Sequence, residues 1–346
     1  MTSTGNTRTP RKLVALVVSL LAVASSAFVV DSAAKEASPT TGCTGPYGWP
    51  VKPFDQAHPV RGSFGDPRTV FRGPNAQRTL YSSSGVFSFH QCVDISAPDG
   101  SPVYAVADGK VTRAHGGRVS VRCGNGRSFQ YWHVEPTVRV GQSAVAGRTV
   151  VGRIQPKREH VHLTHLESGR AVNPFGPGRL APYRDATKPA VIAIAIRRSE
   201  LGGELPTSHV TGNAFFYAEA IDMPALSVPG RWHGFPVTPA LVTWRIETAG
   251  GRVVVAERSA RDVRRIVPKN TEFWATFARG SHQNWPVFAD GKAKGKTGRY
   301  VFRLATKPFD STRLADGDYE LLVTAADVAG NRSVRGLHFT IDNQSH

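Results

Sequence analysis

Three of the twelve histidines fall within six residues, at His160, His162 and His165. In an extended segment the side chains repeat every two residues, so His160 and His162 point to the same face, about 6–7 Å apart along the chain. Val161 and Leu163 alternate with them and point the other way, toward a core. Imidazole is a common zinc ligand, and a catalytic zinc keeps three protein ligands and one open position. The pattern is compatible with a metal site, although two histidines on a strand are more often surface or hydrogen-bonded core residues.

A second pair of possible ligands, His90 and Asp94, lies in the segment Phe89–Ile95, which reads FHQCVDI. On a helix this spacing of four would stack the two side chains, but the residues around Asp94 predict a short strand. A straight strand would hold the two Cα atoms about 13 Å apart. The two side chains therefore share one metal only if the chain bends near His90 or enters the strand there from a loop.

Short β-type runs separated by glycine-bearing turns surround these residues, without helical periodicity. The expected strands are Val103–Val106, Gly109–Arg113, Arg118–Arg122, Ser128–His133 and Thr149–Ile154. They predict an all-β domain that ends near Pro174 and is followed by a Pro- and Gly-rich connector.

A second β-rich set follows the connector. Its expected strands are Ala190–Arg197, His209–Ile221, Leu241–Thr248, Val253–Glu257, Tyr300–Thr306, Tyr319–Ala325 and Leu337–Ile341. The segment Asp327–Asn331 predicts a tight turn before the last strand, and Arg258–Arg265 is expected to form a short helix. About seven short strands in one domain are typical of a β-sandwich.

Length and charge narrow the classes of function. The 346 residues are enough for two domains with separate cores. The formal net charge of +17 predicts attraction to polyanions such as nucleic acid, an anionic membrane or an acidic cell envelope. No compact basic block or ladder of stacking aromatic residues accompanies the charge, so a basic, solvated surface is an equal alternative.

Residues 1–34 have the features of a secretory signal peptide. Arg8, Arg11 and Lys12 precede an apolar run from Leu13 to Val30, and small residues suited to cleavage follow. The run is also long enough for an uncleaved membrane anchor, and both alternatives stay open. The sequence therefore predicts a secreted or cell-envelope protein that does not bind nucleic acid, and that contacts a membrane only if this segment is not cleaved.

A series of short motifs runs through the first β domain in one order. They are Ser63-Phe64-Gly65-Asp66, His90-x-x-x-Asp94, the segment Gly100–Val111, Tyr131-Trp132-His133, Val140-Gly141-Gln142, His160-Val161-His162 and Val172-Asn173-Pro174. Over about residues 60–175 the series resembles the lysostaphin-type zinc endopeptidases, which cut the peptide cross-links of peptidoglycan.

The resemblance implies a role for each matched residue. His90, Asp94 and His162 would bind Zn²⁺, and His133 and His160 would flank the bound water as catalytic residues. Two imidazoles and one carboxylate leave zinc with a positive charge and an open position, which suits activation of water and polarisation of a peptide carbonyl. A neighbouring histidine accepts the proton of the water or donates to the oxyanion, and which of the two does which stays open.

Some positions depart from the family pattern. Cys92 stands where members usually carry glycine, Pro156–Glu159 replaces a region that often holds a glycine, and Leu163-Thr164 replaces an aromatic–acid pair. None of these changes removes an expected ligand, but they leave the cleavage specificity open. His165 lies an odd number of residues from His162 and is expected to face away from the metal.

The three cysteines are Cys43, Cys92 and Cys123, and export permits one disulfide among them. We favour Cys92 with Cys123, because both lie in strand-like segments of one domain, where paired strands bring Cα atoms to a bondable separation. The alternative is that Cys92 is a buried free thiol in place of glycine.

These observations predict an all-β protein. A lysostaphin-type zinc peptidase domain with an antiparallel sheet is expected at residues 60–176, after a lead-in at 35–59. A linker at 177–189 joins it to an immunoglobulin-like β-sandwich at 190–343. The expected function is that of a secreted zinc endopeptidase that hydrolyses peptide bonds in peptidoglycan cross-links or stem peptides and attaches to anionic cell-envelope polymers.

Two other functions remain as alternatives: a catalytically degenerate protein that binds the cell wall or activates another hydrolase, and a secreted protease that acts on proteins. The bond that is cut, the oligomeric state and the partner of the C-terminal domain stay open.

Overall fold

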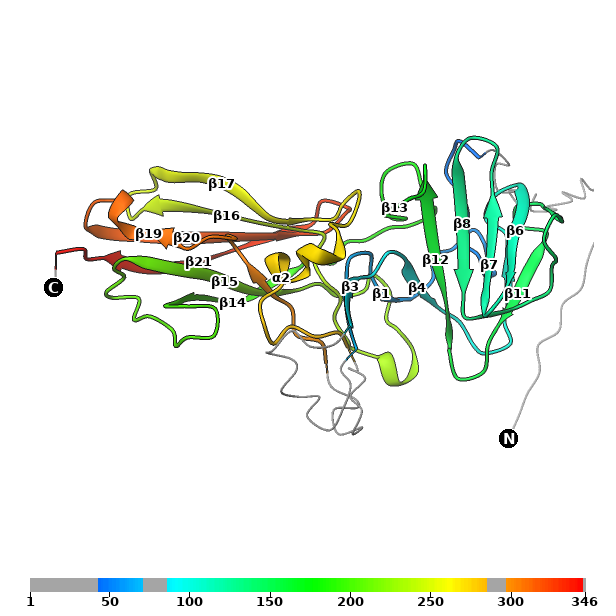
Figure 1. Cartoon of the computed structure of the whole chain (residues 1–346), viewed down its shortest axis with the longest axis horizontal. Coiled ribbons are helices and arrows are strands. Elements are labelled where there is room, and N and C mark those ends of the chain that lie inside the picture. The colour runs from blue at the N-terminus through cyan, green and yellow to red at the C-terminus, as the bar shows by residue number, and fades with distance from the viewer. Residues whose placement is uncertain (1–42, 71–85, 285–296, 345–346) are drawn as a thin grey trace, which may run out of the picture. The chain divides into compact units, whose positions relative to one another are not determined.

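The computed structural model describes residues 43–70, 86–284 and 297–344 (Figure 1). These described residues all belong to one compact unit. The predicted signal peptide lies outside the described residues. Of the helices that are described, none has the length and apolar character needed to cross a membrane. The described chain is mostly β-structure arranged in several antiparallel sheets.

The largest sheet carries most of the expected site residues. Among the described residues it has the strand order β1-β4-β12-β8-β7-β6-β10, and β13 pairs with β12. The strands are β1 Val60–Gly62, β4 Val93–Ser96, β6 Gly109–His115, β7 Arg118–Arg122, β8 Arg127–Trp132, β10 Ser143–Ala144, β12 His160–Glu167 and β13 Arg170–Val172. β12 therefore lies between β4 and β8, which bring residues from distant parts of the sequence beside the histidine pair.

Two smaller sheets accompany the large one. The first has the order β5-β11-β9 and the second pairs β2 with β3. Their strands are β2 Pro67–Val70, β3 Val86–Phe89, β5 Pro102–Tyr104, β9 Val134–Pro136 and β11 Val150–Ile154. β5 and β11 agree with the expected strands Val103–Val106 and Thr149–Ile154 to within a few residues, whereas β2, β3 and β9 were not expected.

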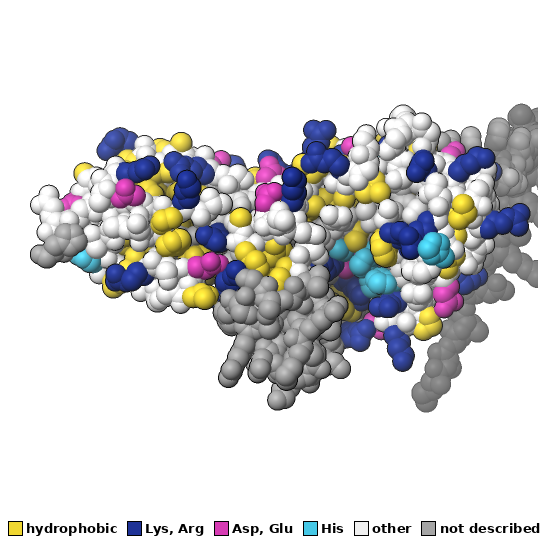
Figure 2. All heavy atoms as spheres, in the orientation of Figure 1, with side chains coloured by type: hydrophobic (Ala, Val, Ile, Leu, Met, Phe, Trp, Pro, Cys, Tyr) yellow, Lys and Arg dark blue, Asp and Glu magenta, His cyan; other side chains and the backbone are white. Residues whose placement is uncertain are grey.

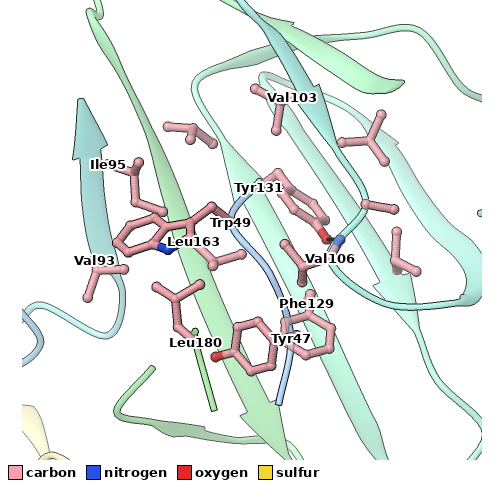
Figure 3. Packing of buried hydrophobic residues seen from close by; sticks show 14 of the residues in the cluster. Tyr47, Trp49, Val93, Ile95, Val103, Val106, Phe129, Tyr131, Leu163 and Leu180 are labelled. Atoms are coloured by element: carbon pink, nitrogen blue, oxygen red, sulfur yellow. Dashed lines mark hydrogen bonds between the residues drawn. The ribbon is translucent and has the colours of Figure 1, made fainter. Parts of the chain in front are cut away.

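Alternation along β12 decides which face is core. Val161 and Leu163 are fully buried, as are Val93 and Ile95 on β4. Figure 3 shows Leu163, Val93 and Ile95 around Trp49. The segment before β1, expected only as a lead-in, thus contributes to the core. Tyr47 from this segment makes an edge-on contact with Phe129, with 4.8 Å between the ring centroids.

The favoured disulfide between Cys92 and Cys123 is wrong, and the sulfur atoms of all three cysteines are free. Cys92 precedes β4 and Cys123 follows β7, and β12 and β8 lie between these two strands. Neighbouring strands are about 4.8 Å apart, so three steps exceed the roughly 7 Å limit on the Cα separation of a disulfide. Cys43 and Cys123 instead both contact the carbonyl oxygen of Asp108, at 3.1 and 3.3 Å.

The second β-rich region has two sheets that share one core. One sheet has the order β14-β15-β18, with β19 paired to β15, and the other has the order β17-β16-β20-β21. The strands are β14 Ala190–Arg197, β15 Asn213–Ile221, β16 Leu241–Thr248, β17 Val253–Asp262, β18 Val301–Arg303, β19 Phe309–Asp310, β20 Gly317–Ala326 and β21 Arg332–Ile341. Phe216, Trp244 and Phe302 are buried in the common cluster.

Helical structure among the described residues is limited to short pieces. They are the α-helix α2 at Phe273–Thr276 and the 3₁₀ turns η1 at Gly230–Trp232, η2 at Asn270–Glu272 and η3 at Ser311–Arg313. The helix expected at Arg258–Arg265 is wrong, because β17 continues to Asp262 and pairs with β16 along that length. Sheet pairing satisfies the backbone there and overrides the local pattern.

Buried hydrogen bonds join this second region to the segment between β1 and β2 within the compact unit. Asp66 Oδ1 accepts from the backbone N–H of Thr238 at 2.9 Å and from its hydroxyl at 2.7 Å. Arg261 donates to the carbonyl oxygen of Gly65 at 2.9 Å and to Thr238 Oγ1 at 3.0 Å. The Ser63–Asp66 motif is thus held partly by the residues that follow the connector.

Candidate metal centre

The sheet brings His90, Asp94 and His162 together. Asp94 is the second residue of β4 and is paired in register with His162 on β12. His90 lies in the short connection between β3 and β4. The chain thus enters β4 from a loop at His90. This is the arrangement that His90 and Asp94, four residues apart, need in order to share one metal.

Donor atoms from four residues form a compact group. Asp94 Oδ1 lies 2.7 Å from Nε2 of His162 and 3.1 Å from Nε2 of His90. Cys92 Sγ lies 2.8 Å from His90 Nε2 and 3.3 Å from His162 Nδ1. One donor atom from each of the four residues lies within 4.8 Å of the others.

These donors fit a zinc ion. Asp94 Oδ1 is buried and accepts no well-aligned hydrogen bond from the described residues, although two imidazole nitrogens lie close to it. The Nδ1 atom of His90 lies 2.9 Å from the carbonyl oxygen of Ser63. A proton on that Nδ1 leaves the Nε2 lone pair directed into the group, as in metal sites whose histidines donate to a backbone carbonyl.

The second oxygen of Asp94 is held from outside the group. Arg68 Nη2 donates to Asp94 Oδ2 at 2.8 Å. Gly62 on the neighbouring strand leaves room for this carboxylate, because a Cβ atom there would lie 2.5 Å from Asp94 Oδ2. Burial alone would raise the pKa of Asp94, but His162, His90 and Arg68 hold it well below its usual value. Asp94 is therefore an oriented anion.

The two histidines expected beside the metal are also present. His133 follows β8 with φ of 63°, an uncommon conformation for a residue with a side chain, and one that clusters at functional sites. Its ring centroid lies 4.7 Å from that of His160 and 4.4 Å from that of His162. Burial, followed by the charge of His162, lowers the pKa of His133 to about 3.

His160 is fixed at both ring nitrogens. Its Nδ1 lies 2.5 Å from the carbonyl oxygen of Arg158, and Arg61 Nη2 lies 3.3 Å from its Nε2. With the proton on Nδ1, the Nε2 lone pair accepts from Arg61. Burial lowers the pKa of His160 to about 2, against the opposing effect of Asp94. His165 points away from this group and packs against Tyr47 and Phe129, as expected.

A cavity of about 360 Å³ opens over these residues. Asp94, His133, His160 and His162 line it, and so do five cationic side chains: Arg61, Arg68, Lys157, Arg158 and Arg231. Figure 2 shows histidine side chains at a recess with Lys and Arg side chains around it.

Sequence reasoning did not identify the cationic lining of the cavity, but it placed Cys92 on the side of the site, close enough for its thiolate to compete for zinc. Arg61 and Arg231 come from β1 and η1, and no local pattern connects them to the histidines. Cys92 did carry a signal, because it lies two residues from both His90 and Asp94 and so shares their face.

Comparison with known proteins places the site in a family. Residues 88–174 match the model for Peptidase family M23, so the chain carries an M23 metallopeptidase domain there. A search of curated protein sequences gave no match.

Several solved structures are similar over part of the chain. The SpoIIQ–SpoIIIAH pore-forming complex matches with 20% identity and a TM-score of 0.29, covering 38% of this chain and 89% of that one. A zinc-containing peptidase from Vibrio cholerae matches with 20% identity and a TM-score of 0.27, covering 37% and 39%. Lysostaphin matches with 15% identity and a TM-score of 0.24, covering 55% and 86%.

Proposed function

Starting from the M23 domain at residues 88–174, we propose that the protein is a secreted zinc-dependent endopeptidase that hydrolyses peptide bonds in peptidoglycan cross-links or stem peptides. One observation carries the proposal: two imidazoles and a buried, oriented carboxylate converge beside two further histidines in an open cavity. We assign His90, Asp94 and His162 as the zinc ligands and His133 and His160 as the catalytic residues.

The chain supplies separate groups for binding and for proton transfer. When bound, zinc acidifies a water molecule and polarises a peptide carbonyl. Among the described residues the His133 ring accepts and donates no hydrogen bond, whereas His160 is held by Arg158 and Arg61. His133 is therefore the better general base, since a base needs a free lone pair within reach of the proton that it removes. His160 keeps Arg61 in place, and the guanidinium donates to negative charge that develops on the substrate.

The cationic lining favours a substrate with a carboxylate. The Arg61 guanidinium stacks over the Trp232 ring, with 4.2 Å between its Cζ atom and the ring centroid. Its Nε and Nη1 atoms are buried without a hydrogen-bond partner among the described residues. Buried donors of this kind are costly unless a ligand satisfies them. Arg231 is compensated by Glu159 at 3.2 Å, which leaves Arg61 as the more available cation. A peptide with a free carboxylate near the scissile bond would supply the missing acceptor.

We also propose the domain organisation that accompanies this function. A peptidase domain at residues 60–176 is followed, after a linker at 177–189, by an immunoglobulin-like sandwich at 190–343 that attaches the enzyme to the envelope. The net charge of +17 supports attachment to anionic wall polymers. Residues 1–34 direct export as a signal peptide.

The test is mass spectrometry of the fragments that the zinc-loaded protein releases from purified peptidoglycan, with casein as a parallel substrate. We expect peptide-bond cleavage in the peptidoglycan and no digestion of casein. Digestion of casein alone would favour a protease that acts on proteins. Binding to peptidoglycan with no fragment released would favour a wall-binding protein or an activator of another hydrolase.

A further inference from the structure

We propose that Cys92 is a fourth zinc ligand, and that its thiolate closes the coordination of the metal held by His90, Asp94 and His162. This inference rests on the proposed zinc site and adds a means of regulating it. It predicts a latent centre, in which water reaches the metal only after the thiolate has moved away.

The position of the sulfur supports this role. Cys92 Sγ lies 2.8 Å from His90 Nε2 and 3.3 Å from His162 Nδ1. Zinc bonds of 2.0–2.1 Å to nitrogen and about 2.3 Å to sulfur, arranged tetrahedrally, separate a nitrogen and a sulfur ligand by about 3.5 Å. The contact with His162 Nδ1 is close to that separation and the contact with His90 Nε2 is shorter, so His90 and Cys92 would move apart to accommodate an ion.

The local backbone explains why residue 92 points into the group. Val93 and Ile95 are fully buried on the core side, and alternation along the chain that enters β4 puts Cys92 and Asp94 on the opposite side. Cys92 is itself only 6% exposed, so its sulfur faces the donors rather than solvent. A glycine at this position would offer no donor.

No cysteine partner competes for this sulfur among the described residues. Cys43 and Cys123 approach each other at the carbonyl oxygen of Asp108, whereas two strands separate Cys123 from Cys92. A thiol hydrogen-bonded to two imidazoles is the alternative. It differs from a ligand in a measurable way, because it leaves zinc without a sulfur neighbour.

The chemistry of the four donors matches a closed site. Two imidazoles, one carboxylate and one thiolate complete a tetrahedron, whereas catalytic zinc sites keep three protein ligands and an open position. Activation therefore requires the thiolate to leave. Replacing Cys92 with glycine should produce a permanently open centre.

X-ray absorption spectroscopy of the zinc-loaded full chain tests the proposal. We expect one sulfur scatterer at about 2.3 Å from zinc in the wild-type protein and in Cys123→Ser, and none in Cys92→Ser. The Co²⁺-loaded protein should show a thiolate-to-metal charge-transfer band that is lost only in Cys92→Ser. A zinc shell of nitrogen and oxygen atoms alone in the wild-type protein would overturn the proposal. This outcome is measured on wild type, so it does not depend on whether a variant folds.

A second readout separates this inference from the proposed function. Loss of a residue that only hydrogen-bonds a metal ligand typically weakens metal binding by about 10- to 100-fold. Loss of the sulfur ligand itself should therefore weaken zinc binding by at least about tenfold. Cys92→Gly should release more peptidoglycan fragments than wild type. Sulfur ligation with no activity in either protein would contradict the enzyme and leave the ligand assignment intact. Equal activity of wild type and Cys92→Gly, with no sulfur bound to zinc in wild type, would contradict the ligand assignment and leave the proposed enzyme intact.

Discussion

The molecule has two buried carboxylates whose pKa values are shifted in opposite directions from that of an ordinary aspartate. Asp94 lies in the largest sheet and Asp222 in the second β-rich region, and each is 6% exposed. His162, His90 and Arg68 keep the pKa of Asp94 well below its usual value in spite of burial. Burial, with Asp185 and then Asp327 beside it, raises the pKa of Asp222 to about 8. Equal burial therefore gives opposite charge states, because the neighbours decide which form is favoured.

The difference also separates the proposed metal ligand from a carboxyl group that favours its protonated form. Asp94 stays ionised, and its Oδ1 is directed toward two imidazoles. Asp222 shares its surroundings with two other carboxylates, whose donor atoms lie within 4.8 Å of it. At neutral pH Asp222 holds a proton, so it relieves repulsion in its cluster. Apart from the closeness of the three carboxylates, nothing among the described residues points to a cation at this cluster.

The largest expected effect comes from removing a ligand beside Asp94. His162→Ala should lose zinc and reduce fragment release from peptidoglycan to background, because one of three essential donors is gone. The control is His338→Ala, since the His338 side chain is 82% exposed and far from the group in sequence. Metal analysis and fragment release are measured on the same samples. Full zinc occupancy in His162→Ala would show that this ligand assignment is wrong.

Removing either proposed catalytic histidine should have a smaller effect. His133→Ala and His160→Ala should keep zinc and lose activity by about 10²–10⁴-fold, as expected for a lost acid–base or oxyanion partner. Zinc content and initial rates give the two readouts. Loss of metal from either variant would mean that the changed residue is a ligand and not a catalyst.

Asp222→Asn tests the other side of the comparison through stability. The folded pKa of about 8 lies above an unfolded value of about 3.9, so the stabilisation from holding the proton is complete below the unfolded value. It is lost as pH rises through the folded value. We expect Asp222→Asn to have a higher Tm than wild type at pH 9 and a similar Tm at pH 4. An equal Tm difference at both pH values would contradict the raised pKa.

The smallest effect concerns the charge of the whole chain. Attachment to anionic wall polymers should weaken from 0.1 M to 1 M salt, because the Debye length falls from about 10 Å to about 3 Å. A cosedimentation assay with purified wall material measures this attachment. Binding that is unchanged across this range would mean that the charge is incidental.

Patterns within single strands predicted the placement of some site residues, and the resemblance to lysostaphin-type enzymes supplied their roles. The alternation at His160 and His162 gave their common face, and the residues around Asp94 predicted the short strand β4, which the chain enters from a loop at His90. Most strand positions followed from β-branched runs and glycine turns. All of these features depend on residues close together in sequence.

Features that depend on strand order were not predictable in the same way. The pairing of Cys92 with Cys123 failed because β12, from much later in the chain, inserts beside β4. The helix expected at Arg258–Arg265 is wrong because β17 continues to Asp262 and pairs with β16 along that length. The burial of Tyr47 and Trp49, and the gathering of Arg61 and Arg231 at the cavity, likewise arise from long-range contacts.

The most direct test of the central claim is the zinc content of wild type, Asp94→Ala and Asp222→Ala, each purified and exposed to the same zinc concentration. We predict one zinc per chain in wild type and in Asp222→Ala and none in Asp94→Ala, because of these two carboxylates only Asp94 lies among imidazole donors. Full occupancy in Asp94→Ala, or loss of zinc in Asp222→Ala, would contradict the account.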